Sequence, residues 1–171
     1  MRKLASLVFF VAASLAAHAG EIPASVDKAE APNWQRLGPG LAVAGQPTPD
    51  LLKKLGAMGF RTAVSLRAPS EGFEKDQALV EQQGLRWVNV PVSPGTFSKK
   101  DVEAVAKVLD DPAAGPVLLY CGSSNRVGGL WAVYQAMKGK SPEEALAEGR
   151  KAGLKSPQMI EAVQRLLTPA P

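Results

Sequence analysis

The sequence predicts an α/β fold with three layers, in which helices cover both faces of a mainly parallel central sheet of four to five strands. Two observations predict it. From Trp34 onward, strand-like and helix-like segments alternate, and residues 116–120 form a continuous apolar run. Alternating segments are typical of a parallel sheet covered on both faces, and a continuous apolar run is typical of a strand buried on both faces. In such sheets, functional residues gather beyond the carboxyl ends of the strands.

Local signals predict the individual elements in order. Short runs of strand-forming residues predict strands over 41–44, 61–66, 85–92 and 116–120. Four helical patterns begin at a Thr or Ser, whose side chain can accept hydrogen bonds from the free N–H groups of a first turn. Helices are therefore expected from Thr48 to near Gly59, over 74–83, from Ser98 to about 109, over about 127–138, from Ser141 and from Ser156.

The length and composition suit one folded domain. The chain has 171 residues, of which 46% are hydrophobic. A chain of this size can bury about two-thirds of the surface that it exposes when unfolded, which is enough for a core without disulfides. The domain is expected to span residues 34–167. A polar, Pro- and Ala-rich lead-in over 20–33 is expected to be flexible, and residues 168–171 form a tail.

The first nineteen residues resemble a secretory signal peptide. Arg2 and Lys3 precede an uncharged apolar run from Leu4 to Ala17, and Ala17-His18-Ala19 fits the small-residue cleavage pattern. The apolar run is shorter than the about 20 residues that a membrane-spanning helix needs. We therefore expect cleavage after Ala19, export to the periplasm and no membrane association of the mature chain.

Cleavage would also change the chemistry available to the protein. His18 is the only histidine, so the mature chain would contain none, which excludes Ser-His and Cys-His catalysis and histidine-ligated metals. The single cysteine, Cys121, cannot form an internal disulfide or a multi-cysteine metal site. Loss of Arg2 and Lys3 lowers the formal charge from +4 to +2, which does not suggest a nucleic-acid partner. No metal and no organic cofactor are expected.

One loop carries a constellation with chemical meaning. Cys121 ends the apolar run, and Arg126 follows where a helix is expected to begin. Between them lie four small or short polar residues, Gly122, Ser123, Ser124 and Asn125. Backbone N–H groups, a helix N-terminus and a guanidinium that converge in this way form an anion site and favour a thiolate. The loop therefore predicts a nucleophile surrounded by oxyanion donors.

The alternative interpretation of Cys121 is a small buried hydrophobic residue at the end of a strand. Two features favour a functional role. An unpaired thiol in an oxidising compartment requires a reason, and the Cys-to-Arg spacing fits an anion-binding turn. By contrast, the acidic residues Glu71, Glu74 and Asp76 are interpreted as a solvated loop and helix face, not as a metal cluster.

The Cys-x4-Arg motif after an apolar strand resembles the phosphatase-like domain of bacterial beta-lactamase hydrolase-like proteins. Residues 41–50, 59–67 and 90–96 resemble the strand-Gly-Gln-Pro opening, the second strand and the loop after the third strand of that family. The resemblance covers about residues 34–167. It implies the fold of tyrosine and dual-specificity phosphatases, Cys121 as the nucleophile and Arg126 as the phosphate-binding residue.

Two departures from the tyrosine phosphatase pattern leave the reaction open. Those loops usually have five residues between the Cys and the Arg, and a His before the Cys. In this chain four residues separate Cys121 from Arg126, and Tyr120 precedes the Cys. The shorter loop resembles that of rhodanese-type sulfurtransferases. The pattern also places an acidic residue after the third strand, but residues 90–100 contain no Asp or Glu. Asp101 is expected to lie at the start of a helix as a partner of its dipole. Ser93, in the place of the acid, receives no catalytic role, so the general acid is unassigned.

Three functions therefore remain. The leading hypothesis is an exported hydrolase that acts through a cysteinyl-phosphate on a small phosphate ester. The second is a sulfurtransferase that carries a persulfide on Cys121 and accepts a sulfane-sulfur donor, and the third is a non-catalytic module that binds an oxyanion or a phosphorylated ligand. Arg67 and Gln46 end strands that could face the same site and are candidate accessory residues. Their alternative roles are a surface salt bridge for Arg67 and a turn for Gln46.

Overall fold

The structure is a computed structural model, and it describes residues 21–168. In these residues five strands form one sheet in the order β1-β2-β5-β3-β4. The outer strand β1 runs antiparallel to β2, while β2, β5, β3 and β4 are parallel to one another. This confirms the mainly parallel sheet. The strands are β1 (Gln35–Gly38), β2 (Leu41–Ala44), β3 (Thr62–Ser65), β4 (Arg86–Asn89) and β5 (Val117–Tyr120).

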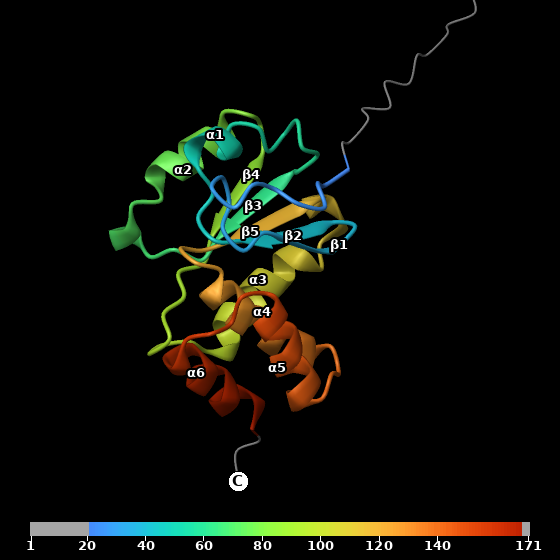
Figure 1. Ribbon diagram of the computed structural model, residues 1–171, viewed down its shortest axis with the longest axis vertical. Helices are drawn as coiled ribbons and strands as arrows, with labels where there is room; N and C mark the ends of the chain where they lie inside the picture. Colours follow the sequence, from blue (N-terminus) through green and yellow to red (C-terminus); the bar gives the residue numbers. More distant parts are fainter. Residues whose placement is uncertain (1–20, 169–171) are drawn as a thin grey trace, which may run out of the picture.

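Helices cover both faces of the sheet and make the three layers (Figure 1). One face is covered by α1 (Pro49–Leu52) and α2 (Glu74–Glu81), and the short 3-10 helix η1 (Pro69–Glu71) precedes α2. The other face is covered by α3 (Lys99–Leu109), α4 (Asn125–Met137), α5 (Pro142–Lys151) and α6 (Pro157–Leu167), with a second 3-10 helix, η2 (Pro112–Ala114). Each face therefore has its own hydrophobic core.

The central strand β5 contributes to both cores, as its apolar sequence predicts. Leu119 packs into the core beneath α3 and α4, whereas Leu118 and Tyr120 pack into the core beneath α1 and α2. All four residues of β5 are buried. Because β5 lies between β2 and β3, its carboxyl end opens in the middle of the sheet edge, and Cys121 follows directly.

Several helix starts agree with the capping signals. The hydroxyl of Ser156 accepts a hydrogen bond from the Met159 N–H at 3.3 Å, and that of Ser141 accepts one from Glu144 at the same distance. The first helix differs from the expectation because α1 ends at Leu52 and does not continue to near Gly59. Beyond it, Lys54 and Leu55 donate to the carbonyls three residues earlier, and these tighter turns bring Leu55 into the core.

The segment before the sheet is more ordered than expected. Residues 21–33 were expected to be a flexible lead-in, but Ile22 and Ala31 are buried in the core beneath α1 and α2. Glu21 also pairs with Arg36 of β1 at 2.7 Å, and β1 is a strand that the sequence patterns did not reveal. The predicted signal peptide, residues 1–19, and residues 169–171 of the predicted tail lie outside the described residues.

The helices below the sheet pack at very short range. A Cβ added to Gly128 of α4 would lie 2.5 Å from the carbonyl oxygen of Gly149 in α5 and would overlap the backbone N of Leu154. Only glycine allows this approach of α4 to α5 and the segment after it. Within residues 21–168, no helix is both long and apolar enough to cross a membrane.

We expect the substitution Gly128→Ala to lower the free energy of unfolding by about 1–3 kcal/mol, because overpacking against backbone atoms outweighs the small helix-propensity gain of alanine. Urea denaturation followed by circular dichroism measures this loss. Gly95→Ala is the control, since its new Cβ would meet no atom within 4 Å. Equal stability of the Gly128→Ala protein and the wild type would contradict the packing described above.

Candidate active site

Cys121 lies at the base of a loop that joins β5 to α4. Its side chain is fully buried, whereas Gly122 and Ser123 are exposed at the rim. Within residues 21–168, the backbone N–H groups of Gly122, Ser123, Asn125 and Arg126 have no acceptor, and Ser123 forms an isolated antiparallel bridge with Gly45. These residues include the start of α4, where free N–H groups favour an anion. We call residues 121–126 the cradle.

Side chains of the cradle anchor it to the segment between α5 and α6. The Ser124 hydroxyl donates to the Ala152 carbonyl at 2.9 Å. The Asn125 side chain donates to the Ser156 hydroxyl at 2.8 Å and accepts from the backbone N–H groups of Lys155 and Ser156 at 2.9 Å. The structure thus brings the four predicted loop residues to one place, but Ser124 and Asn125 offer the centre only their backbone N–H groups.

Arg126 is held by a carboxylate that the sequence patterns did not assign to the site. Its Nη1 and Nη2 atoms contact the two carboxylate oxygens of Glu71 at 2.6 and 2.7 Å. Nη1 also donates to the Leu66 carbonyl at 3.1 Å. In the described residues Nε has no acceptor, so Glu71 binds the guanidinium end-on and leaves the Nε–Nη2 edge for a second bidentate partner.

Electrostatics keep this pair ionised. The hydrogen bond from Arg126 holds the pKa of Glu71 below its usual value, against the opposing effect of burial. The same hydrogen bond raises the pKa of Arg126, and the neighbouring Cys121 thiol group raises it further. Glu71 is therefore a carboxylate at neutral pH, and in this arrangement it has no proton to donate to a leaving group.

A second carboxylate, Asp76 of α2, joins three strand ends beneath the cradle. One of its oxygens accepts from Arg67 after β3 at 2.8 Å, from Gln46 after β2 at 2.9 Å and from the Tyr120 hydroxyl of β5 at 3.2 Å. Burial is the main cause that raises the pKa of Tyr120, so its hydroxyl stays protonated and donates. Asp76 thus binds the residue that precedes Cys121.

The two candidate accessory residues support the cradle from behind. The Arg67 side chain contacts Asp76 and the Glu71 carbonyl, and the Gln46 side chain contacts Asp76. The backbone N–H of Gln46 donates to the Gly122 carbonyl at 3.1 Å. Neither side chain donates into the cradle, so the structure assigns both a supporting position.

The acidic residues differ from their interpretation as a solvated loop and helix face. Only Glu74 is exposed, whereas Glu71 holds Arg126 and Asp76 is buried. Arg67, which follows β3, was the one residue in the sequence that could have drawn attention to nearby carboxylates. Within residues 21–168, no group of three or more His, Cys, Asp or Glu side chains is arranged to hold a metal ion.

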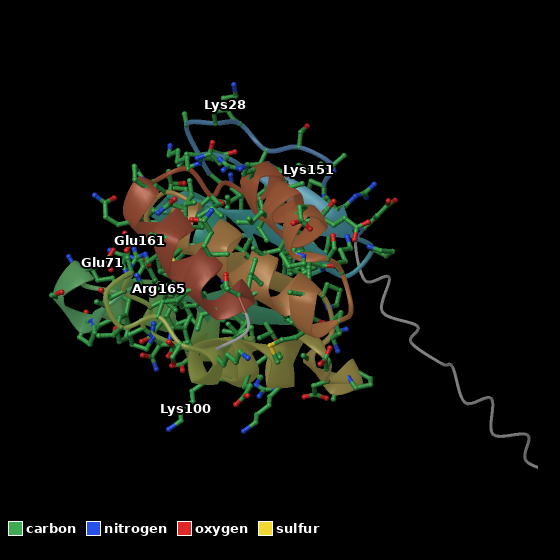
Figure 2. All side chains as sticks on the ribbon, turned by 90° about the horizontal axis from the view of Figure 1, so that it is seen from below. Lys28, Glu71, Lys100, Lys151, Glu161 and Arg165 are labelled. Carbon is green, nitrogen blue, oxygen red and sulfur yellow. The ribbon has the colours of Figure 1, made fainter. Side chains whose placement is uncertain are left out.

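A hollow of about 350 Å³ lies beside Arg126, and its lining also includes Glu71, Ser93 and Pro94. Figure 2 shows Glu71 at the same end of the molecule as Glu161 and Arg165 of α6. Asp101 lies in the first turn of α3, as expected, and its carboxylate accepts from the Ser98 N–H at 2.9 Å. It therefore does not replace the acid that residues 90–100 lack.

Comparisons with known proteins agree with this geometry. A family model described as "Beta-lactamase hydrolase-like protein, phosphatase-like domain" matches residues 33–138, more than half of the chain. No protein of curated function matches the chain.

Solved structures share the fold at low sequence identity. TpbA of P. aeruginosa is 24% identical with a TM-score of 0.65, over 88% of this chain and 90% of that chain. Tk-PTP is 20% identical with a TM-score of 0.64, over 79% and 96% of the two chains. The PP-IP phosphatase SIW14 of S. cerevisiae is 14% identical with a TM-score of 0.63, over 77% and 83%. The fold is that of tyrosine and dual-specificity phosphatases.

We expect the Glu71–Arg126 pair to stabilise the protein only where Glu71 is ionised. The folded state lowers the pKa of Glu71 from its ordinary 4.5. Its stabilisation is therefore complete above about pH 4.5 and is lost as the pH falls through the lowered value. Urea unfolding of wild type and Glu71→Gln should show a gap at pH 7 that narrows towards pH 3. Glu74→Gln, which changes an exposed carboxylate, is the control. A gap that does not change with pH would contradict the ion pair.

Proposed function

The chain belongs to the family of phosphatase-like domains of beta-lactamase hydrolase-like proteins, and on that premise we propose that it is a cysteine-dependent phosphatase that hydrolyses aryl phosphate monoesters. The cradle supports this proposal most directly. A buried cysteine lies beneath unpaired N–H groups, and the free edge of Arg126 can bind two oxygens of a phosphoryl group. A variant of TpbA has been solved in complex with pTyr, which favours a phosphate ester as the substrate class.

In the proposed reaction, the Cys121 thiolate attacks phosphorus. The S–P bond forms while the P–O bond to the aryl group breaks, and the phenolate that leaves takes a proton from water. The N–H groups of residues 122–126 and Arg126 bind the three remaining phosphoryl oxygens. Such preorganised donors stabilise the charge that develops in the transition state. Water then attacks the cysteinyl-phosphate, the P–S bond breaks, inorganic phosphate leaves and the thiolate is restored.

The electrostatics around the cradle favour substrates with good leaving groups. Residues 90–100 contain no carboxylic acid, and Arg126 keeps Glu71 ionised. A missing general acid typically costs 10²–10⁴-fold when the leaving group is poor. Aryl phosphates avoid most of this cost, because a phenolate departs more readily than an alkoxide.

The four-residue spacing between Cys121 and Arg126 favours a second candidate, transfer of sulfane sulfur through a persulfide. Thiosulfate would donate its outer sulfur to the Cys121 thiolate, with sulfite as the leaving group. This chemistry also needs no strong acid, so the absence of an acid does not separate the two reactions.

We expect purified protein to release phosphate from 4-nitrophenyl phosphate and Cys121→Ser to lose at least 10³-fold in kcat, because the hydroxyl of serine is a far weaker nucleophile here than a thiolate. Assays of phosphate release and of thiosulfate-dependent thiocyanate formation, run side by side, distinguish the candidates. Arg126→Lys is the companion variant, which keeps the charge but removes the bidentate edge.

The outcomes are distinct. Phosphate release by the wild type and its loss in Cys121→Ser support the phosphatase. A Cys121 persulfide with thiocyanate formation and no phosphate release supports sulfur transfer instead. Phosphate binding without either activity supports an anion-binding module. Equal phosphate release by wild type and Cys121→Ser rules out the proposed nucleophile.

We also propose that the protein is exported. The basic start, the apolar run and Ala17-His18-Ala19 support this proposal. Expression of the full chain in a Gram-negative host should yield a periplasmic protein whose N-terminus is Gly20, as intact-mass spectrometry can measure. Recovery of uncleaved protein from the cytoplasm would contradict export, and a variant with Ala17 and Ala19 changed to Lys controls for the cleavage site.

A further inference from the structure

A cavity of about 670 Å³ is lined by α2 and by the segment after β2. Its volume is in the range of sites for small organic molecules. Both segments contribute apolar side chains to the lining, namely Pro47, Pro49, Ala78 and Leu79. The lining contains none of residues 121–126, so the cavity is a feature separate from the cradle. An aromatic ring of a small molecule can bury its surface against these apolar walls.

The cavity is also lined by a buried carboxylate that has one unused oxygen. Asp76 belongs to the lining and is only 7% exposed. Its three hydrogen bonds, from Gln46, Arg67 and Tyr120, all end on Oδ2. Within residues 21–168, no donor contacts its Oδ1, and this atom is not among the unpartnered polar atoms that are fully buried. A ligand in the cavity can therefore supply the hydrogen bond that Oδ1 lacks.

The charges of the lining decide which kind of donor suits Asp76. The lining contains this one carboxylate and three cations, which are Arg67, Lys53 and Lys75. Lys53 pairs with Asp50 at 3.1 Å. Lys75 is exposed, and within residues 21–168 it makes no ion pair. An excess of positive charge disfavours a cationic ligand and favours an uncharged O–H donor on a molecule that also carries an acidic group.

We propose that this cavity is a binding site for small hydroxyaryl acids, separate from the cradle. The hydroxyl donates to Oδ1 of Asp76, the ring lies against Pro47 and Leu79, and the acidic group lies towards the exposed ammonium of Lys75. The three donors on Oδ2 keep their places, so the ligand adds a fourth hydrogen bond to Asp76 without displacing a residue. The proposal does not rest on the phosphatase reaction, because no residue of the cradle takes part.

Three related probes test the proposal by NMR titration of the 15N-labelled protein. We expect 4-hydroxyphenylacetate to shift the amide signals of Gly72, Ala78 and Leu79 in a saturable way and to leave those of Gly122 and Ser123 unchanged. Phenylacetate, which lacks only the hydroxyl, should show a Kd at least about tenfold higher, because a hydrogen bond to a charged group is strong. 4-Methylphenol, which lacks the acid, should also bind more weakly than 4-hydroxyphenylacetate.

Lys75→Glu and Lys107→Glu form a matched pair of variants. Lys107 is an exposed residue of α3, on the opposite face of the sheet, and its substitution changes the net charge by the same amount. We expect Lys75→Glu to raise the Kd of 4-hydroxyphenylacetate about fivefold and to leave that of 4-methylphenol unchanged, because only the first probe carries an acid. Lys107→Glu should change neither Kd.

Inorganic phosphate serves as the comparison ligand, and it should shift the amides of Gly122 and Ser123 instead. Two separate sets of shifted amides support two sites. The proposal is overturned if 4-hydroxyphenylacetate shifts no amide of the cavity lining or only those of the cradle. It is also overturned if phenylacetate binds equally well, or if Lys75→Glu and Lys107→Glu have equal effects. A failure of phosphate to bind would count against the proposed phosphatase function and not against this site.

Discussion

The buried carboxylate of Asp76 is the constraint on which the site depends. An ion removed from water costs several kcal/mol unless its partners are well placed, and one oxygen of Asp76 finds three donors at 2.8 to 3.2 Å. These donors come from residues at the ends of β2, β3 and β5, so a shift of any one strand would leave the charge under-coordinated. Asp76 thereby fixes the ends of the three strands relative to one another. These strand ends in turn position Cys121, which directly follows Tyr120.

Acidic and basic side chains alternate from Asp76 through Arg67 and Glu71 to Arg126 of the cradle. Arg67 contacts Asp76 and the backbone of Glu71, and Glu71 binds Arg126 at 2.6 and 2.7 Å. Because the carboxylate of Glu71 takes the end of the guanidinium, it orients Arg126 without occupying the edge that faces an oxyanion. The same arrangement explains why Glu71 is a poor acid, since the contact that positions Arg126 also keeps Glu71 ionised. Positioning and proton donation are competing demands on this one side chain.

Sequence patterns predicted what depends on neighbouring residues and missed what depends on distant ones. The run before Cys121 and the capping Ser and Thr residues are local, and they located the central strand, several helix starts and the cradle. The Glu71–Arg126 pair joins residues 55 positions apart, and nothing in a polar stretch marks which carboxylate will turn inward. The early end of α1 at Leu52 has a similar origin, because burial of Leu55 decides where the chain bends.

The cradle is also held from its outer side by residues that lie beyond the matched family region, which ends at residue 138. The segment between α5 and α6 binds the side chains of Ser124 and Asn125, and Gly153 lies against Ser124, which adopts a left-handed conformation with φ of 65°. These contacts bind both polar side chains to the segment between α5 and α6. Donors fixed before an anion arrives need no reorganisation when it binds. The segment between the two C-terminal helices therefore helps to hold the cradle in place.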